Sequence, residues 1–218
     1  PKGVAQRDPY FGTCVVRATE AAKEPPSDFA RNDYSRRQAF NADNSRFIVY
    51  AYNGFWHLYD ANTLQHLRVL NGLAGDAEPQ WHPTDPRKLF YLPNLGGMQL
   101  LQLDVETNTS STVANFSGKL PWANAARVWT KSEGSPSADA RYWCFQAETQ
   151  DFRILGVFTY DLQTQSVVGS RPMSSRPDHV SMSPSGRHCV VSNLSGEGGT
   201  VAWNRSFTTS RQLHHTSE

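Results

Sequence analysis

The feature that most restricts the fold of this sequence is a repeated pattern of polar turn, arginine and apolar strand. Four segments carry the pattern: 40–50, 81–91, 136–145 and 182–191. A second signature follows the first three, with an apolar residue, an aspartate and a threonine three positions later: Asp60 with Thr63, Asp104 with Thr107, and Asp161 with Thr164. An Asp at a strand end accepts hydrogen bonds from the N–H groups of the next turn, which explains that residue type there. Such self-similarity predicts a repeat architecture.

The spacing of the aspartates indicates which repeat this is. Asp104 follows Asp60 by 44 residues and Asp161 follows Asp104 by 57, so the third unit has 13 more, which we place around 146–153. A period near 44 with about four short strands per unit is typical of a β-propeller blade. In the first unit we expect strands near 37–40, 47–52, 55–60 and 66–70. We therefore predict an all-β propeller of four-stranded blades rather than a sandwich of unrelated hairpins; the best helical candidate is only 20–23.

The repeats divide the chain, as one propeller domain or a fragment of one, into an N-terminal segment and four blades. The segment covers 1–35 and contains a strand at 12–17, and the blades cover 36–74, 75–118, 119–175 (with the insertion) and 176–218. Rings of six to eight blades are commoner than four-bladed ones for such repeats. We therefore expect these four to belong to a larger ring, whose final blade the strand at 12–17 would complete.

Composition excludes several classes of protein. With 21 basic and 20 acidic residues the net charge is +1, which argues against nucleic acid as the main partner. The longest apolar runs are as short as 47–50, so no membrane span is expected. Cys144 and Cys189 have opposite phases relative to the preceding arginine, so we expect buried thiols rather than a bridge, with Cys14 also unpaired. No serine-hydrolase elbow, phosphate loop or zincin motif is present.

Several segments resemble a known repeat family. The segments 78–83, 87–91, 100–104 and 178–187 look like the WD40-like repeat of TolB-type propellers, and the resemblance covers roughly 36–215. It implies a propeller fold and an exported protein, secreted or periplasmic. The superfamily includes periplasmic scaffolds, peptidase propellers, and oligogalacturonate and ulvan lyases. No catalytic signature of the lyases matches residue by residue, so none is carried over.

Candidate site residues follow from the propeller geometry, because the residues before each inner strand converge at one mouth of the central channel. This set is strongly ionisable: Tyr34, Arg36, Arg37, Asp76, Glu78, Trp129, Lys131, Glu133, Arg176, Asp178 and His179. Glu218 begins the next position of the series.

Three interpretations compete for this set. The first is a polysaccharide lyase that acts by β-elimination, with Arg36, Arg37, Lys131 and Arg176 neutralising a uronate carboxylate, His179 as base and Tyr34 as acid. The second is a noncatalytic platform for a glycan or a protein partner, with Trp56, Trp122 and Trp129 stacking on sugars. The third is structural pairing between adjacent blades.

The remaining histidines suit simpler roles. His82 occupies the turn position of Asn41 and Ser183, His57 is expected to pack half-buried, and His66 and His188 to lie at the surface or an edge. Of His214 and His215, one at most could join His179 and Glu218 in a metal cluster, because adjacent strand residues point to opposite faces. No cofactor is required, and a divalent metal (Ca²⁺, Mn²⁺ or Zn²⁺) is left open. The oligomeric state is not predicted.

Overall fold

A computed structural model of this protein describes residues 1–20, 22–25, 30–35, 37–131, 134–193 and 198–215. All regular structure in these residues is β. At the best helical candidate, Lys23 N–H donates to Glu20 O in a turn. Pro25 lies two residues beyond Lys23, so a helix there could not extend. No described segment forms a helix long and apolar enough to cross a membrane.

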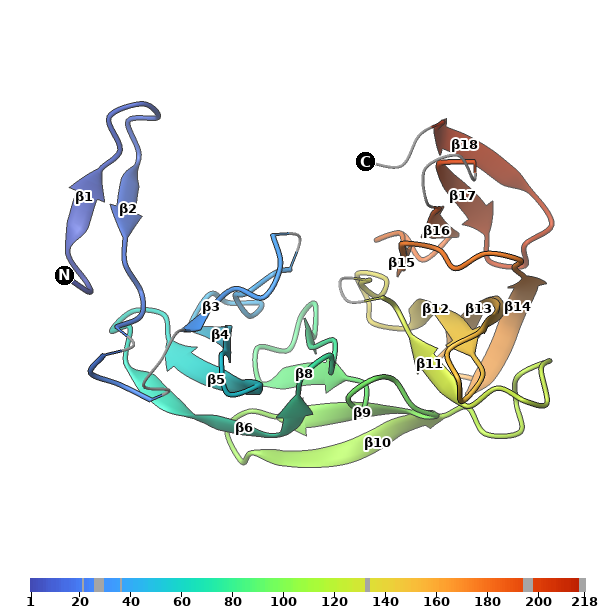
Figure 1. The fold of residues 1–218 in the computed structure, drawn as a ribbon, viewed down its shortest axis with the longest axis horizontal. Coiled ribbons are helices and arrows are strands. Elements are labelled where there is room, and N and C mark those ends of the chain that lie inside the picture. Colours follow the sequence, from blue (N-terminus) through green and yellow to red (C-terminus); the bar gives the residue numbers. More distant parts are fainter. Residues whose placement is uncertain (21, 26–29, 36, 132–133, 194–197, 216–218) are drawn as a thin grey trace.

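Sixteen strands form four antiparallel sheets, each with its strands side by side in chain order. The first blade contains β3 (Ala30–Arg31), β4 (Arg46–Ala51), β5 (Phe55–Asp60) and β6 (His66–Ala74), and the second β7 (Gln80–Trp81), β8 (Lys88–Tyr91), β9 (Gln99–Asp104) and β10 (Thr109–Asn115). The third contains β11 (Arg127–Trp129), β12 (Tyr142–Glu148), β13 (Ile154–Asp161) and β14 (Ser166–Pro172), and the fourth β15 (His179–Met182), β16 (His188–Ser192), β17 (Thr200–Asn204) and β18 (Ser210–His214). The blades follow one another around an open arc (Figure 1), which confirms the propeller fold.

The N-terminal strand does not join a blade. The strand β2 (Cys14–Val16) pairs with β1 (Ala5–Arg7) in a hairpin that stands apart at one end of the arc, while the fourth blade lies at the other end (Figure 1). Within the described residues the strand expected at 12–17 therefore belongs to a two-stranded sheet of its own.

The repeated aspartate closes each hairpin as predicted. Asp60 Oδ1 accepts hydrogen bonds from the N–H groups of Asn62 and Thr63, both at 2.9 Å. Asp104 and Asp161 make the equivalent pairs of bonds in the second and third blades. Each aspartate also forms an ion pair with the repeated arginine, which explains why both residue types recur: Arg46–Asp60 at 2.9 Å, Arg87–Asp104 at 2.8 Å and Arg141–Asp161 at 2.7 Å.

Two expectations about the strands were wrong. In the first blade the inner strand is β3, and the segment expected to hold it contributes only an isolated bridge between Phe40 and Phe47. The extra residues of the third unit do not lie around 146–153, because a turn at 149–153 joins β12 to β13. They are divided equally between two connections: 116–126 before β11 corresponds to 75–79 in the second blade, and 130–141 after β11 corresponds to 82–87. In the first and third blades an irregular segment lies between the inner strand and the second strand. The periodicity of apolar residues in strands does not reveal such a segment.

The core is built between blades. Trp56 and Leu58 of the first blade pack with Trp81 and Leu103 of the second. In the third blade, Trp143 and Phe145 face the second blade, whereas Cys144, between them in sequence, packs with Met182 and Val191 of the fourth. Alternate residues of β12 thus contact opposite neighbours, so one face of each blade packs on the opposite face of the next.

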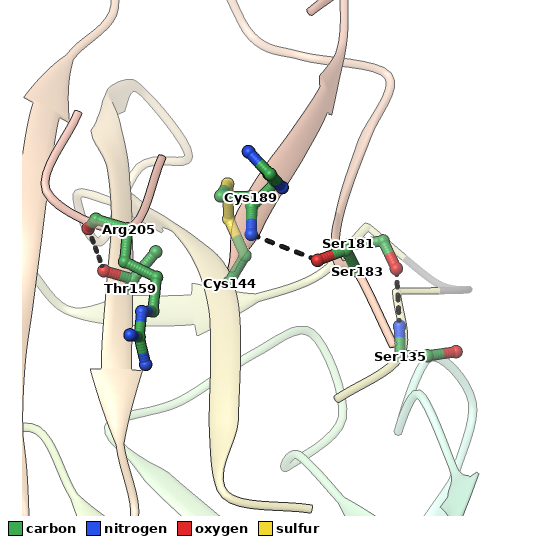
Figure 2. Close-up of a disulfide and its surroundings, with 8 residues drawn as sticks. Ser135, Cys144, Thr159, Ser181, Ser183, Cys189 and Arg205 are labelled. Carbon is green, nitrogen blue, oxygen red and sulfur yellow. Dashed lines mark hydrogen bonds between the residues drawn. A yellow bond between two sulfur atoms is a disulfide. The ribbon is translucent and has the colours of Figure 1, made fainter. Parts of the chain in front are cut away.

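This packing overturns the cysteine prediction. Cys144 and Cys189 form a disulfide between the third and fourth blades, with their Cα atoms 5.4 Å apart (Figure 2). Their opposite phases suggested that they could not meet. Adjacent blades, however, contact each other through opposite faces, so opposite phases are what bring the two side chains together. Cys14 is exposed and free.

Candidate ligand-binding rim

The residues that precede the inner strands form two neighbouring groups. One lies between the first and second blades and is called the first-blade pocket: Arg31, Asp33, Tyr34, Arg37, Tyr50, Trp56, Gly75, Asp76 and Glu78 line its cavity of about 190 Å³. The other is the third-blade cluster, which consists of Trp129, Lys131, Gln146, Glu148 and Arg176. Glu78 connects the two groups, because its Oε2 accepts hydrogen bonds from Thr130 N–H at 2.6 Å and Thr130 Oγ1 at 3.1 Å.

In the first-blade pocket the arginine is buried. The Arg37 side chain is 1% exposed, and its Nε donates to both carboxylate oxygens of Asp33 at 2.6 and 2.7 Å. Its Nη1 donates to the carbonyl of Pro79 in the second blade, and the guanidinium lies over the Trp56 ring. Arg37 thus joins two blades, whereas Tyr34, 49% exposed, is one of the accessible groups of this pocket, with Arg31 and Asp76.

In the third-blade cluster the arginine is held but open. Arg176 Nε donates to Glu148 Oε1 at 2.7 Å and its Nη2 donates to the carbonyl of Phe152 at 2.7 Å. The side chain is 35% exposed, and the other guanidinium hydrogens have no protein partner among the described residues. Two contacts therefore orient a guanidinium whose remaining donors can receive an anion.

Lys131 adds a second cation to this cluster. Its Nζ lies 4.5 Å from the centre of the Trp129 ring, a cation–π contact. No carboxylate within the described parts of the chain pairs with Lys131. The backbone of Lys131 has a φ of 61°, a left-handed conformation that turns the chain at the end of β11.

Glu148 is the residue of this group that the sequence analysis missed. It lies on β12 and is fully buried; besides Arg176, Gln146 Nε2 donates to its Oε1 at 3.1 Å. Burial raises the pKa of the Glu148 carboxyl, although Arg176 and Lys131 both act to lower it. The only sequence signal was an acidic residue in an otherwise uncharged strand, 142–148, and its role depends on which strand faces Arg176.

Three buried polar atoms beside this ion pair have no hydrogen-bond partner in the described structure. They are Trp129 Nε1, Gln146 Oε1 and Glu148 Oε2. The Trp129 N–H stabilises the charged form of Glu148, but it lies outside hydrogen-bond geometry. Unmatched buried polar groups are uncommon in folded proteins and cluster where function requires them.

The tryptophans do not offer their faces to a sugar. Trp56 is 2% exposed and Trp129 3% exposed, so neither ring is available to stack on a ligand. Each makes a cation–π contact instead, Trp56 with Arg37 and Trp129 with Lys131. Trp122 packs against the core between the second and third blades.

His179 begins β15, on the same segment as Arg176 and Asp178. The next residue, Val180, donates its N–H to Thr130 O, which sets the start of β15 against the end of β11. His179 therefore lies beside the third-blade cluster. Three predicted positions, Arg36, Glu133 and Glu218, lie outside the described residues.

The other histidines follow the sequence interpretation in most respects. His82 is a turn residue: its Nδ1 accepts a hydrogen bond from Asp85 N–H at 3.0 Å. His188 is exposed, whereas His57 is 1% exposed and pairs through Nδ1 with Nε2 of half-buried His66 at 2.9 Å. Burial, with a smaller effect of His66, lowers the pKa of His57 to about 4.

The described residues contain no cluster of metal-ligating side chains. No three His, Cys, Asp or Glu side chains in this part of the protein converge so that they could hold a metal ion. His214 lies on β18 in the fourth blade and is exposed. We therefore derive no step through a metal.

Comparison with solved structures shows the fold of known propellers. The chain is similar to an oligogalacturonate lyase in complex with manganese, with a TM-score of 0.69 and 18% identity, covering 99% of this chain and 60% of that one. It is also similar to the oligogalacturonate lyase of Vibrio parahaemolyticus, with a TM-score of 0.69, 13% identity, and 98% and 60% coverage. The hydrazine synthase of Kuenenia stuttgartiensis matches with a TM-score of 0.54 and 14% identity, over 82% of this chain and 49% of that one.

These likenesses confirm the propeller fold. The chain spans about 60% of the length of the two lyases. No family model matches the sequence, and no curated protein matches it.

Proposed function

We propose that the rim at the third and fourth blades binds the carboxylate of an anionic carbohydrate, and that the protein is an exported lyase acting on a uronate polymer. The observation that carries the proposal is the Arg176 guanidinium, held by Glu148 and the Phe152 carbonyl with its remaining donors open. Lys131 lies close enough to act on the same glutamate. Two cations around one buried carboxylate leave a net positive charge for a ligand.

The chemistry of β-elimination suits these residue types. Arg176 and Lys131 would neutralise the uronate carboxylate, which makes the proton at C5 more acidic. His179 would accept that proton, the electrons of the C–H bond would form the C4–C5 double bond, and the oxygen at C4 would leave with a proton from an acid. Tyr34 is proposed as this acid, and Arg36 as a further cation. Glu78, Glu133 and Asp178 are proposed to line the binding site, whereas Arg37 is proposed to hold its wall through Asp33 and the Pro79 carbonyl.

The fold supports the proposal. Two structures with this fold are oligogalacturonate lyases, one of them in complex with manganese. A divalent metal therefore stays part of the proposal, to be tested by measuring activity of the full-length protein with and without a chelator. Manganese-dependent activity would support a metal, and activity unchanged by the chelator would remove it.

The central test combines catalysis and binding. The full-length protein is incubated with polygalacturonate, alginate or ulvan, and the ultraviolet absorbance of the new double bond is followed. Arg176→Lys keeps the charge but loses the planar fork, so affinity for a uronate oligosaccharide should fall roughly tenfold in calorimetry. Arg187→Lys, an exposed arginine of the same blade, is the matched control. Equal affinity of Arg176→Lys and the unsubstituted protein would contradict the proposed site.

A noncatalytic scaffold that binds a protein or a glycan is the second candidate. It is favoured by the polar contacts that tie rim residues across blades, such as Glu78 to Thr130 and Arg37 to Pro79. Uronate binding without absorbance on any of the three polymers would select this candidate. Loss of activity in His179→Ala, with affinity retained, would select the lyase.

A further inference from the structure

A second cavity lies at the opposite ends of the inner strands, where each polar turn begins. Its volume is about 360 Å³, within the range of roughly 300–1,000 Å³ that is usual for small-molecule sites. All four blades contribute to it, through Phe40 of the first, Gln80 and His82 of the second, Pro136 of the third and Pro184 of the fourth. None of the described residues of the proposed uronate site lines this cavity.

Hydrogen bonds between blades hold this cavity in shape. Trp81 Nε1 donates to Ala39 O at 2.8 Å, and Asn41 Nδ2 donates to Pro86 O at 3.0 Å, so the first and second blades are joined at its wall. Ala138 N–H donates to Pro184 O at 2.9 Å, which joins the third and fourth. The cavity is therefore largely formed before any ligand arrives.

The lining combines apolar and polar side chains and is uncharged. None of the described residues that line it is Asp, Glu, Lys or Arg. The Phe40 ring is 43% exposed and is held in place by Phe47, with ring centres 5.5 Å apart. Burial lowers the pKa of His82, and its Nδ1 accepts hydrogen bonds, so the neutral ring carries its proton on Nε2 as a donor.

One polar atom in this wall lacks a partner. Gln80 is 7% exposed, and its Nε2 is buried with no hydrogen bond in the described structure. A buried amide N–H without a partner destabilises the free protein. A ligand oxygen at this cavity would relieve that loss.

We propose that this cavity binds a residue of a neutral oligosaccharide. The apolar face of a sugar ring would lie on Phe40, with Pro136 and Pro184 around it. Neighbouring hydroxyl groups both donate and accept hydrogen bonds, as do the Gln80 amide and the amide of Gln38, another lining residue. An anionic sugar is disfavoured here, since no cation lines the cavity to compensate for its desolvation.

Calorimetry on the full-length protein with cellohexaose, xylohexaose and maltohexaose tests this proposal. At least one should bind, with an affinity that does not change with salt, because no charge is involved. Gln80→Leu should weaken that affinity roughly tenfold without lowering the free energy of unfolding, since the leucine removes an unpartnered donor. Gln163→Leu, an exposed glutamine of the third blade, is the control.

The outcomes separate this site from the uronate site. Loss of neutral-sugar binding in Gln80→Leu, with uronate binding retained, supports the proposal even if Arg176→Lys has no effect on uronate affinity. Failure of all three oligosaccharides to bind in the millimolar range would overturn it. Equal affinity of Gln80→Leu and the unsubstituted protein for the oligosaccharide would overturn it too. So would the finding that a proline-containing peptide, and not a sugar, binds at Phe40.

Discussion

The junction between the first and second blades and the junction between the third and fourth use the same residue type in opposite ways. At the first junction Arg37 is buried and joins the blades, through Asp33 on one side and the Pro79 carbonyl on the other. At the second, a disulfide and the bonds from Thr159 to the Arg205 carbonyl and from Ser135 N–H to Ser181 already join the blades (Figure 2). Arg176 also bonds across this junction, to Glu148 and the Phe152 carbonyl, but its side chain is 35% exposed and its other donors stay open.

A repeat protein can thus use one blade junction for stability and another for ligand binding. An arginine that holds two blades together cannot release its donors to a ligand without loosening the fold. Where a covalent bond and other hydrogen bonds join the blades, the arginine at the rim remains available. Four predictions test this division, beginning with the largest expected effect.

Removal of the disulfide should have the largest effect. The cysteines are 45 residues apart, and closing a loop of that length stabilises a fold by about 4 kcal/mol. The double variant Cys144→Ala/Cys189→Ala should lose about that much free energy of unfolding in urea titrations. Cys14→Ser, at the exposed free cysteine, should be unchanged. A double variant as stable as the unsubstituted protein would show that the disulfide does not hold this junction.

Removal of the buried arginine should have the next largest effect. Arg37→Met leaves Asp33 and the Pro79 carbonyl without their donor, and breaking such a buried pair costs about 3 kcal/mol. Urea titration of the variant measures the loss. Arg187→Met replaces an exposed arginine and should change stability by less than about 0.5 kcal/mol. If the two variants lose equally little, Arg37 does not join the blades and the comparison fails.

Acidification should weaken the first blade through His57. Its pKa in the fold is about 4, against 6.5 for an ordinary histidine, so the unfolded chain binds the proton more readily. The free energy of unfolding should therefore be greatest above pH 6.5 and have fallen by about 2 kcal/mol at about pH 5.

The slope of stability against pH tests this assignment. In His57→Phe it should be flatter over the same window, while His188→Asn, at an exposed histidine, should keep it. An unchanged slope in His57→Phe would assign the acid sensitivity to another group. The aspartates of the hairpin turns have lowered pKa values and lose their contribution only at lower pH.

The smallest effect is expected from the second cation of the third-blade cluster. Lys131 is partly exposed, so Lys131→Met should weaken binding of a uronate oligosaccharide by only about threefold, and it should flatten the dependence on salt. Calorimetry at two salt concentrations gives both quantities. A loss larger than that of Arg176→Lys would make Lys131, and not Arg176, the principal carboxylate ligand.

Much of the fold could be predicted from the sequence because local chemistry repeats in each blade. The aspartate that ends the third strand and the arginine at the start of the second form the same ion pair in three blades, and the aspartate forms the same turn. These contacts join residues that are close in sequence. The repeat also predicted that the residues before the inner strands converge, and Arg176 and Lys131 are among the residues named on that basis.

Other features were decided only by tertiary structure, because they depend on how one blade faces the next. Opposite phases of Cys144 and Cys189 excluded a disulfide within one sheet, but back-to-front packing of two sheets brings the sulfur atoms together. The sequence does not distinguish Glu148 from other strand residues, because only the packing of the blades places it beside Arg176. Which arginine is buried and which is open likewise depends on neighbours distant in sequence. The sequence by itself determined the repeating unit and its turns; the contacts between units decided which residues remain available to a ligand.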